Sequence, residues 1–343
     1  MEEVIALVLA AGKGTRMKSK LPKVLHKAGG VPMVGQVLRA VKDAGTKREI
    51  VVVGFGAEAV TAYVGETAET VVQKEQLGTG HAVLQAESLL QGEKGILLVT
   101  CGDTPLVRTE TFRALLDCHK KTQASATVLT ACMPDPTGYG RVIRSADGKV
   151  SKIVEQKDGT SQELAVNEVN AGIYCFELPE LWELLHRIGN NNAQGEYYLT
   201  DIIGMLVADG KTVSAVAAED YRETLGVNSR LQLAQAEKIL RERKLEELMT
   251  EGVTVQDPSN TYVETTVTVG RDTVLYAGTV LEGRTVIGEN CEIGPFVRLT
   301  NVAMGDGNSL QYTYAHDCTI ENNLTAGPFV HFRPKTHIED HVK

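Results

Sequence analysis

Short apolar runs alternate with amphipathic segments over the first 220 or so residues. Four runs rich in aliphatic and β-branched residues predict buried strands: Val4–Leu9, Ile50–Val53, Ile96–Thr100 and Ala126–Leu129. Apolar residues at helical spacing predict helices from Pro32, as first helical residue, to before Gly45, over Thr79–Leu90 and over Thr109–Thr122. This alternation is typical of a doubly wound α/β domain, in which helices cover a parallel sheet.

A long charged helix is predicted to follow this domain. Asn228 and Ser229 can cap a helix over Arg230–Met249, and Gly252 can end it. The hydrophobic pattern changes completely after this point. We therefore divide the chain into a first domain (1–228), a linker helix (229–250) and a third segment (251–343).

The third segment carries aliphatic residues at a six-residue period. Seven consecutive positions fit it: Val263, Val269, Leu275, Leu281, Ile287, Ile293 and Leu299. The phase slips by one residue at Met304 and continues at Ile320, Ala326, Phe332 and Ile338. Hexapeptide repeats of this kind form a left-handed parallel β-helix, here of roughly four and a half turns. An antiparallel sandwich would instead show a period of two.

Composition and charge narrow the classes of function. The 343 residues, 43% hydrophobic and 23% charged, suffice for two folded domains and exclude a disulfide-stapled miniprotein. The net charge of -9 opposes nucleic-acid binding, so local cations and backbone N–H groups must hold any anionic ligand. The six cysteines form no Cys-x-x-Cys motif and suggest no zinc site. We see no signal peptide and no membrane span, and we expect a cytoplasmic location and no membrane partner.

The densest candidate chemistry follows the first predicted strand, in Leu9–Met17 and Leu21–Leu25. Ligands of open α/β sheets bind at the carboxyl ends of the strands. Gly12 and Gly14 let backbone N–H groups approach phosphate oxygens, and Arg16 and Lys23 add positive charge. The alternative is a structural glycine-rich turn with two surface cations. Neither the dinucleotide-binding pattern nor the P-loop pattern is complete here.

The motifs together resemble those of sugar-1-phosphate nucleotidyltransferases. The resemblance is carried by nine segments: Leu9–Met17, Leu21–His26, Gln73–Ala82, Gly102–Leu106, Pro136–Arg141, Ile153–Asp158, Glu168–Ile173, Asn191–Asp201 and Gly226–Arg230. The residues of these segments resemble those of the N-acetylglucosamine-1-phosphate uridyltransferases. The helix and the repeats also match the bifunctional bacterial branch, which adds a glucosamine-1-phosphate N-acetyltransferase domain.

This resemblance implies a Rossmann-like nucleotidyltransferase domain that transfers UMP from UTP to N-acetylglucosamine-1-phosphate for cell-wall precursor synthesis, with release of pyrophosphate. It implies Arg16 and Lys23 as catalytic cations, and Mg²⁺ on Asp103 and Asn228. The implied nucleotide site comprises Leu9, Ala10, Ala11, Gly12, Gly14, Thr15, Lys23, Gln73, Gly78, Thr79, Cys101, Gly102 and Asp103. The implied sugar site comprises Gly140, Glu155, Asn170 and Asn228, with Tyr198 and Thr200 as further candidates. Carboxylate and amide oxygens suit Mg²⁺, although Asp103 and Asn228 could both be helix caps instead.

Two other functions stay open. A glucose-1-phosphate thymidylyltransferase is disfavoured because such enzymes carry Glu-Lys-Pro where this chain has Glu155–Asp158. A noncatalytic sugar-nucleotide-binding assembly subunit is disfavoured because Arg16, Lys23, Asp103 and Asn228 are all present.

The acetyltransferase part departs from the family pattern. Arg333 matches an arginine of its sugar-phosphate site, but the Lys, His, Tyr and Asn positions that follow in the family have no counterpart. We therefore expect an incomplete β-helix, truncated within that domain, and no acetyl transfer by this chain. Cys101 also differs from what relatives carry. The resemblance further implies a homotrimer formed through the β-helix.

Overall fold

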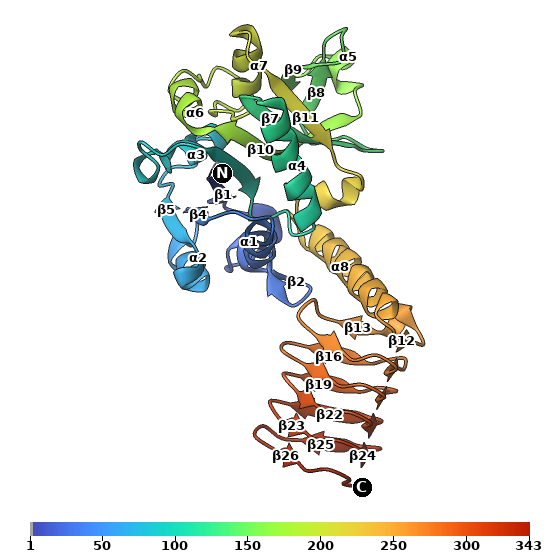
Figure 1. Ribbon diagram of the computed structural model, residues 1–343. Helices are drawn as coiled ribbons and strands as arrows, with labels where there is room; N and C mark the ends of the chain where they lie inside the picture. Colours follow the sequence, from blue (N-terminus) through green and yellow to red (C-terminus); the bar gives the residue numbers. More distant parts are fainter. Residues whose placement is uncertain (1–2) are drawn as a thin grey trace. The chain divides into compact units, whose positions relative to one another are not determined.

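The computed structural model describes residues 3–343 and contains two compact units (Figure 1). The first comprises the residues up to His26 and Pro32–Gln232. The second comprises Lys27–Val31 and Leu233–Lys343. None of the helices within residues 3–343 combines the length and the apolar character needed to cross a lipid bilayer.

A mixed nine-stranded sheet forms the centre of the first unit. Its main path has the order β11-β7-β10-β6-β1-β4-β5, and β8 and β9 extend it beside β10. The strands are β1 (Val4–Ala10), β4 (Arg48–Val53), β5 (Glu69–Val72), β6 (Ile96–Cys101), β7 (Ala126–Cys132), β8 (Arg141–Arg144), β9 (Val150–Val154), β10 (Glu168–Glu177) and β11 (Val213–Ala217). The prediction of a parallel sheet is confirmed for β1, β4, β5 and β6. It is wrong for β10, which runs antiparallel to β6 and β7 after the β8–β9 hairpin has reversed the chain.

Helices cover both faces of this sheet, which confirms the doubly wound architecture. Alternate residues of β1 enter two separate cores, Ile5 and Leu7 on one face and Ala6 and Val8 on the other. The helices of the first core are α3 (Thr79–Leu84), α6 (Leu178–Leu185) and α7 (Asp201–Ala208), and those of the second are α1 (Met33–Asp43), α2 (Ala57–Val64) and α4 (Thr109–Thr122). A short α5 (Ser161–Leu164) lies between β9 and β10.

Two helix boundaries differ from the prediction. Pro32 is not the first helical residue, because it pairs in an extended hairpin of β2 (Lys27–Ala28) and β3 (Val31–Pro32), and α1 begins one residue later. The helix that begins at Thr79 ends at Leu84 instead of Leu90, and a separate 3-10 turn over Glu87–Leu89 follows it.

The second unit contains most of α8 (Arg230–Thr250) and a three-sided, left-handed parallel β-helix (Figure 1). Each side is a five-stranded parallel sheet. The strands are β12 (Thr254–Val255), β13 (Tyr262–Val263), β14 (Thr268–Val269), β15 (Val274–Leu275), β16 (Val280–Glu282), β17 (Val286–Ile287), β18 (Glu292–Ile293), β19 (Arg298–Thr300), β20 (Ala303–Met304), β21 (Ser309–Leu310), β22 (Thr313–His316), β23 (Thr319–Ile320), β24 (Thr325–Ala326), β25 (Val330–Phe332) and β26 (His337–Ile338).

The aliphatic residues of the six-residue period stack on one another inside the β-helix. Val263 lies beside Leu281, and Leu281 beside Leu299, in successive coils. The phase slip is also confirmed, because Ile287 pairs with Met304, one residue short of a full repeat. The coils begin at β12, before the first position of the recognised period, so the β-helix has five coils and not four and a half.

The stacked interior gives a stability prediction for two adjacent residues of β17. Ile287 is 2% exposed and Val286 is 49% exposed. Replacing Ile287 by Ala leaves a cavity between coils, and we expect it to lower the free energy of unfolding by about 2–4 kcal/mol. Replacing Val286 by Ala should cost less than about 1 kcal/mol. Urea unfolding followed by circular dichroism measures both, and equal losses would contradict the inward orientation of Ile287.

Candidate functional site

The carboxyl ends of β1 and β6 bring candidate residues together. The two strands are parallel neighbours, with Leu9 opposite Cys101. The Gly102 N–H donates to the Leu9 carbonyl at 2.9 Å, so the chain leaves both strands at the same edge of the sheet. The next strands place Gln73 at this edge as well, since its N–H donates to the Val53 carbonyl at 2.8 Å. Ligand sites of open α/β sheets occur at such an edge.

A cavity of about 260 Å³ lies there. Nine candidate nucleotide-site residues line it: Leu9, Ala11, Gly12, Lys23, Gln73, Gly78, Thr79, Cys101 and Asp103. Gln76, Ala82 and Glu196 complete the lining. Gln76 was a weaker candidate for the uracil site that could also have been a solvated surface residue, and the sequence motifs had assigned no role to Ala82 and Glu196. A larger hollow of about 340 Å³ is lined by α8 and β-helix residues of the second unit. The volume of a cavity therefore does not identify the site. The chemical character of the residues that line the smaller cavity does.

The other four nucleotide candidates do not line this cavity. Ala10 is buried in the core, so it can offer only backbone atoms. Gly102 packs beside Ala10 and Val24, and Thr15 is exposed. Gly14 has a φ of +58°, and a Cβ there would lie 2.6 Å from the Lys23 Cβ, so this position requires glycine.

The loop between Ala11 and Met17 leaves room beside its backbone. A Cβ at Gly12 would meet nothing within 4 Å, so open space lies beside the Gly12 Cα. Arg16 is exposed on the 3-10 turn Thr15–Met17. This candidate catalytic cation therefore lies outside the cavity lining.

Lys23 joins the two candidate metal ligands. Its ammonium donates to the Asp103 carboxylate and, at 2.9 Å, to the Asn228 side-chain oxygen. The Val227 N–H also donates to the Asp103 carbonyl at 2.8 Å, which holds the two segments together. Lys23 and Asp103 expose only 12% and 17% of their side chains. Two oxygen donors thus converge on one cation, which is the arrangement a hard divalent metal ion would use.

This pair is not a preformed metal cage. Within residues 3–343, no group of three or more His, Cys, Asp or Glu side chains could hold a metal ion. Mg²⁺ is often bound by one or two protein oxygens together with water and substrate phosphates. The Asp103–Asn228 pair fits that mode of binding.

The Gln73 amide is held in place by its neighbours. Only 3% of Gln73 is exposed, and its Nε2 donates to the Gly78 carbonyl at 3.2 Å. The same nitrogen lies 3.0 Å from Nδ1 of His81, a residue of the motif that the sequence had left without a role. A buried amide with a fixed orientation is suited to reading one edge of a base.

The candidate sugar residues form a second cluster. The Asn170 N–H donates to the Gly140 carbonyl at 2.9 Å, and the Thr200 hydroxyl donates to Glu155 at 3.1 Å. A Cβ on Gly140 would lie 3.4 Å from a Glu155 carboxylate oxygen. The pairing of β10 with β7 shifts its register directly after Asn170. This irregularity brings the Gly172 carbonyl to 3.8 Å from the Cys101 thiol, so the sugar cluster adjoins the nucleotide residues.

Burial raises the pKa of one residue in each cluster, Glu155 and Cys101. Burial raises the pKa of Glu155, and the nearby Asp158, Asp201 and Glu196 carboxylates add to this rise, while the bond from Thr200 opposes it. Burial also raises the pKa of the Cys101 thiol to about 12, so this thiol is protonated and uncharged at neutral pH.

Two family models match the chain. The model described as "Nucleotidyl transferase" matches residues 5–238, and that described as "Bacterial transferase hexapeptide (six repeats)" matches residues 266–301. A solved structure of UDP-glucose pyrophosphorylase complexed with UDP-glucose aligns with a TM-score of 0.57 at 17% identity. The alignment covers 71% of the present chain and 100% of the pyrophosphorylase chain, and at this identity it supports the fold alone.

Several bacterial proteins are similar over nearly the whole chain, and each is called "Bifunctional protein GlmU". That of Geobacillus sp. (strain WCH70) is 52% identical over 98% of this chain and 74% of its own length. The protein of Halalkalibacterium halodurans is 48% identical over 100% of this chain and 75% of its own length. The Brevibacillus brevis protein is 46% identical over 100% of this chain and 74% of its own length.

The raised pKa of Glu155 predicts a pH-dependent change in stability. A carboxyl group whose pKa is higher in the folded chain destabilises that chain as pH rises through its unfolded pKa. The melting temperature of Glu155→Gln should therefore rise relative to that of the unsubstituted protein between about pH 4 and pH 7. The rise should be about 2–4 °C for each kcal/mol of unfolding free energy gained.

Glu163→Gln is the matched control of opposite sign. Lys152 and Thr160 lower the pKa of Glu163 to about 2, so its charged form stabilises the fold. Removing that charge should lower the melting temperature by an amount that grows between about pH 2 and pH 4 and stays nearly constant above that. Melting curves of the three proteins from about pH 2 to pH 7 measure both effects, and parallel profiles for Glu155→Gln and the parent would contradict the shift.

Proposed function

The chain belongs to the nucleotidyl transferase family and to its bifunctional GlmU branch, and on that premise we propose that its first unit is a UDP-N-acetylglucosamine pyrophosphorylase. In this reaction UMP passes from UTP to N-acetylglucosamine-1-phosphate and pyrophosphate is released. The product would serve cell-wall precursor synthesis in the cytoplasm.

One observation carries the proposal: Lys23, Asp103 and Asn228 meet at the carboxyl edge of the sheet, beside the cavity that Gly12, Gln73 and Gly78 line. Phosphate recognition needs a cation and free backbone N–H groups, and metal-assisted transfer needs oxygen ligands. The same edge supplies all three kinds of group. A purely structural turn would not require a buried lysine between a carboxylate and an amide.

We assign the nucleotide to the cavity, with uracil beside Gln73, Gly78 and Thr79. The triphosphate would then lie along the loop that contains Gly12 and Gly14. Backbone N–H groups of that loop and the cations of Lys23 and Arg16 would neutralise it. Arg16 is exposed, so its side chain can turn onto the β- and γ-phosphates.

The sugar phosphate would lie beside Gly140, Glu155 and Asn170. Glu155 accepts hydrogen bonds from hydroxyl groups, as it does from Thr200, and Asn170 can pair with the acetamido group. A phosphate oxygen of the sugar phosphate attacks the α-phosphorus of UTP and forms the new P–O bond. The bond from the α-phosphorus to the oxygen that bridges to the β-phosphorus breaks, and pyrophosphate leaves with that electron pair. The attacking oxygen is already anionic near pH 7, so the reaction needs no general base.

Enzymes of this family depend on a metal ion, and we propose Mg²⁺ on Asp103 and Asn228. When bound, Mg²⁺ would supply positive charge that offsets the negative charge of the phosphates and of the leaving group. Lys23, which contacts both Asp103 and Asn228 in the structure, would then be available to the triphosphate.

A matrix of four substrate pairs tests the function. Pyrophosphate release is measured with UTP or dTTP, each with N-acetylglucosamine-1-phosphate or glucose-1-phosphate. We expect turnover mainly with UTP and N-acetylglucosamine-1-phosphate. Preference for dTTP and glucose-1-phosphate would indicate a thymidylyltransferase, and no release from any pair would indicate a noncatalytic sugar-nucleotide-binding subunit.

Two aspartate variants complete this test. Asp103→Ala should lower kcat by at least about 100-fold, because it removes a proposed metal ligand. Asp147→Ala changes a carboxylate that interacts with Ser145 and Lys149 in the β8–β9 turn, and it should leave kcat unchanged. Near-normal turnover of Asp103→Ala would overturn the metal assignment.

We also propose that the protein is a homotrimer joined through the β-helix. Hexapeptide repeats expose three flat sheets whose outer faces can pack against other copies. Light scattering should give about three times the chain mass of 37.1 kDa. A monomer or a dimer over a range of protein concentrations would contradict the trimer.

A further inference from the structure

We propose that Glu223 is a positioning residue for the metal pair: its buried carboxylate ties the segment that carries Asn228 to the segment that carries Asp103. The inference rests on the proposed function, because that function assigns a divalent cation to Asp103 and Asn228. No motif of the sequence had singled out Glu223.

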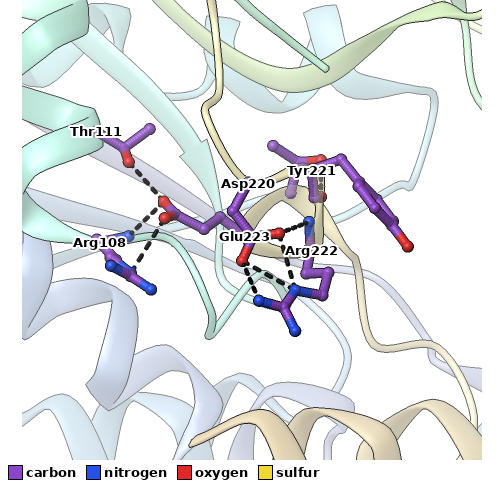
Figure 2. A network of polar contacts seen from close by, with 7 residues as sticks. Arg108, Thr111, Asp220, Tyr221, Arg222 and Glu223 are labelled. Carbon is purple, nitrogen blue, oxygen red and sulfur yellow. Dashed lines mark hydrogen bonds and ion pairs between the residues drawn. The ribbon is translucent and has the colours of Figure 1, made fainter. Parts of the chain in front are cut away.

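Glu223 makes its contacts with the start of α4 (Figure 2). Its carboxylate accepts the Thr111 hydroxyl at 2.5 Å and the Arg108 backbone N–H at 3.3 Å. The Arg108 guanidinium completes an ion pair at 3.1 Å. The Glu223 side chain is only 6% exposed, whereas the Arg108 side chain is 48% exposed. Glu223 is therefore a desolvated carboxylate that this one group of donors holds in place.

The charge of Glu223 suits this position. Arg108 is the N-cap residue of α4, and its side chain makes no capping hydrogen bond. A carboxylate near the N-terminus of a helix is stabilised by the helix dipole, and Glu223 supplies one from a distant part of the chain. The neighbouring Arg222 forms its ion pair with Asp220, in the same 3-10 turn (Figure 2). That separate pair leaves the contacts of Glu223 with Arg108 and Thr111 intact.

The two segments are joined at both ends. One runs from Asp103 to Arg108, and the other runs from Glu223 to Asn228. Glu223 binds Arg108 at one end, and the Val227 N–H binds the Asp103 carbonyl at 2.8 Å at the other. Releasing the first tie removes one of the constraints on the distance between the Asp103 and Asn228 side chains, beside the Val227–Asp103 bond and the contacts of Lys23. Groups that orient metal ligands in this way commonly contribute about 10-fold or more to metal affinity.

The experiment measures UTP binding by calorimetry, with and without saturating Mg²⁺ and without sugar phosphate, so that no turnover occurs. In the parent protein Mg²⁺ should raise the affinity for UTP. In Glu223→Ala that gain should fall about 10-fold, while the affinity without Mg²⁺ stays within about twofold. Glu223→Gln, which keeps an acceptor oxygen, and Thr111→Val, which removes one donor, should each show a smaller loss of the same kind. These milder variants decide the question if Glu223→Ala does not fold.

Glu180→Gln is the matched control. Glu180 is a partly buried carboxylate in the first turn of α6 and pairs with Lys211 at 2.7 Å. Its replacement should lower the melting temperature without changing the gain from Mg²⁺. A Glu223 variant that behaves like this control, or that weakens UTP binding equally with and without Mg²⁺, would reduce Glu223 to a purely structural residue and overturn the inference.

The binding readout separates this inference from the proposed function. If the parent protein binds UTP more tightly with Mg²⁺ but releases pyrophosphate with no substrate pair, the proposed uridylyl transfer fails, and the variants still decide the role of Glu223. If Mg²⁺ does not change UTP binding by the parent protein, the inference is overturned whatever the turnover.

Discussion

The contact of Lys23 with Asp103 and Asn228 is the interaction on which the geometry of the site depends. It joins Lys23 to two residues that lie 80 and 205 positions further along the chain. The parallel pairing of β1 with β6 makes it possible, because this pairing brings the chain out of both strands at one edge. Asn228 reaches the same place because the Val227 N–H binds the Asp103 carbonyl. A change of register between β1 and β6 would therefore separate the phosphate loop from Asp103 and dismantle the whole site.

The sequence predicted best those elements whose pattern is local. The helix over Thr109–Thr122 was predicted with its observed bounds, since its apolar face repeats regularly. The β-helix was predicted from a period that each coil repeats, and Met304 marked the phase slip correctly. The direction of β10 could not be predicted, because its hydrogen bonds depend on strands distant in sequence. The early end of α3 was missed because the apolar pattern continues through a 3-10 turn.

The residues of the candidate site also differ in how far the sequence could predict them. A glycine-rich turn after β1 was predicted from the order of residues alone, and the structure gives Gly14 the positive φ that favours glycine. Gln73 and Asn170 were found only through the family resemblance, because nothing in their local spacing marks a ligand site. Glu223 and Glu196 were missed for a third reason. Each is one glutamate in an acidic chain, and only the folded chain shows that Glu223 is buried and that Glu196 lines the cavity.

Electrostatics explains why a chain with a net charge of -9 can serve a triphosphate. Lys23 is already engaged with a carboxylate, so it adds little free positive charge to the cavity. Attraction of the polyanion must therefore come from the N–H groups of the Gly12–Gly14 loop, from the exposed Arg16 and from a cation that arrives with the nucleotide. If Asp103 and Asn228 hold a divalent cation, as proposed, Lys23 would be available to the phosphates. Metal and nucleotide binding would then be coupled by charge balance, and the position of Asp103 and Asn228 would control both.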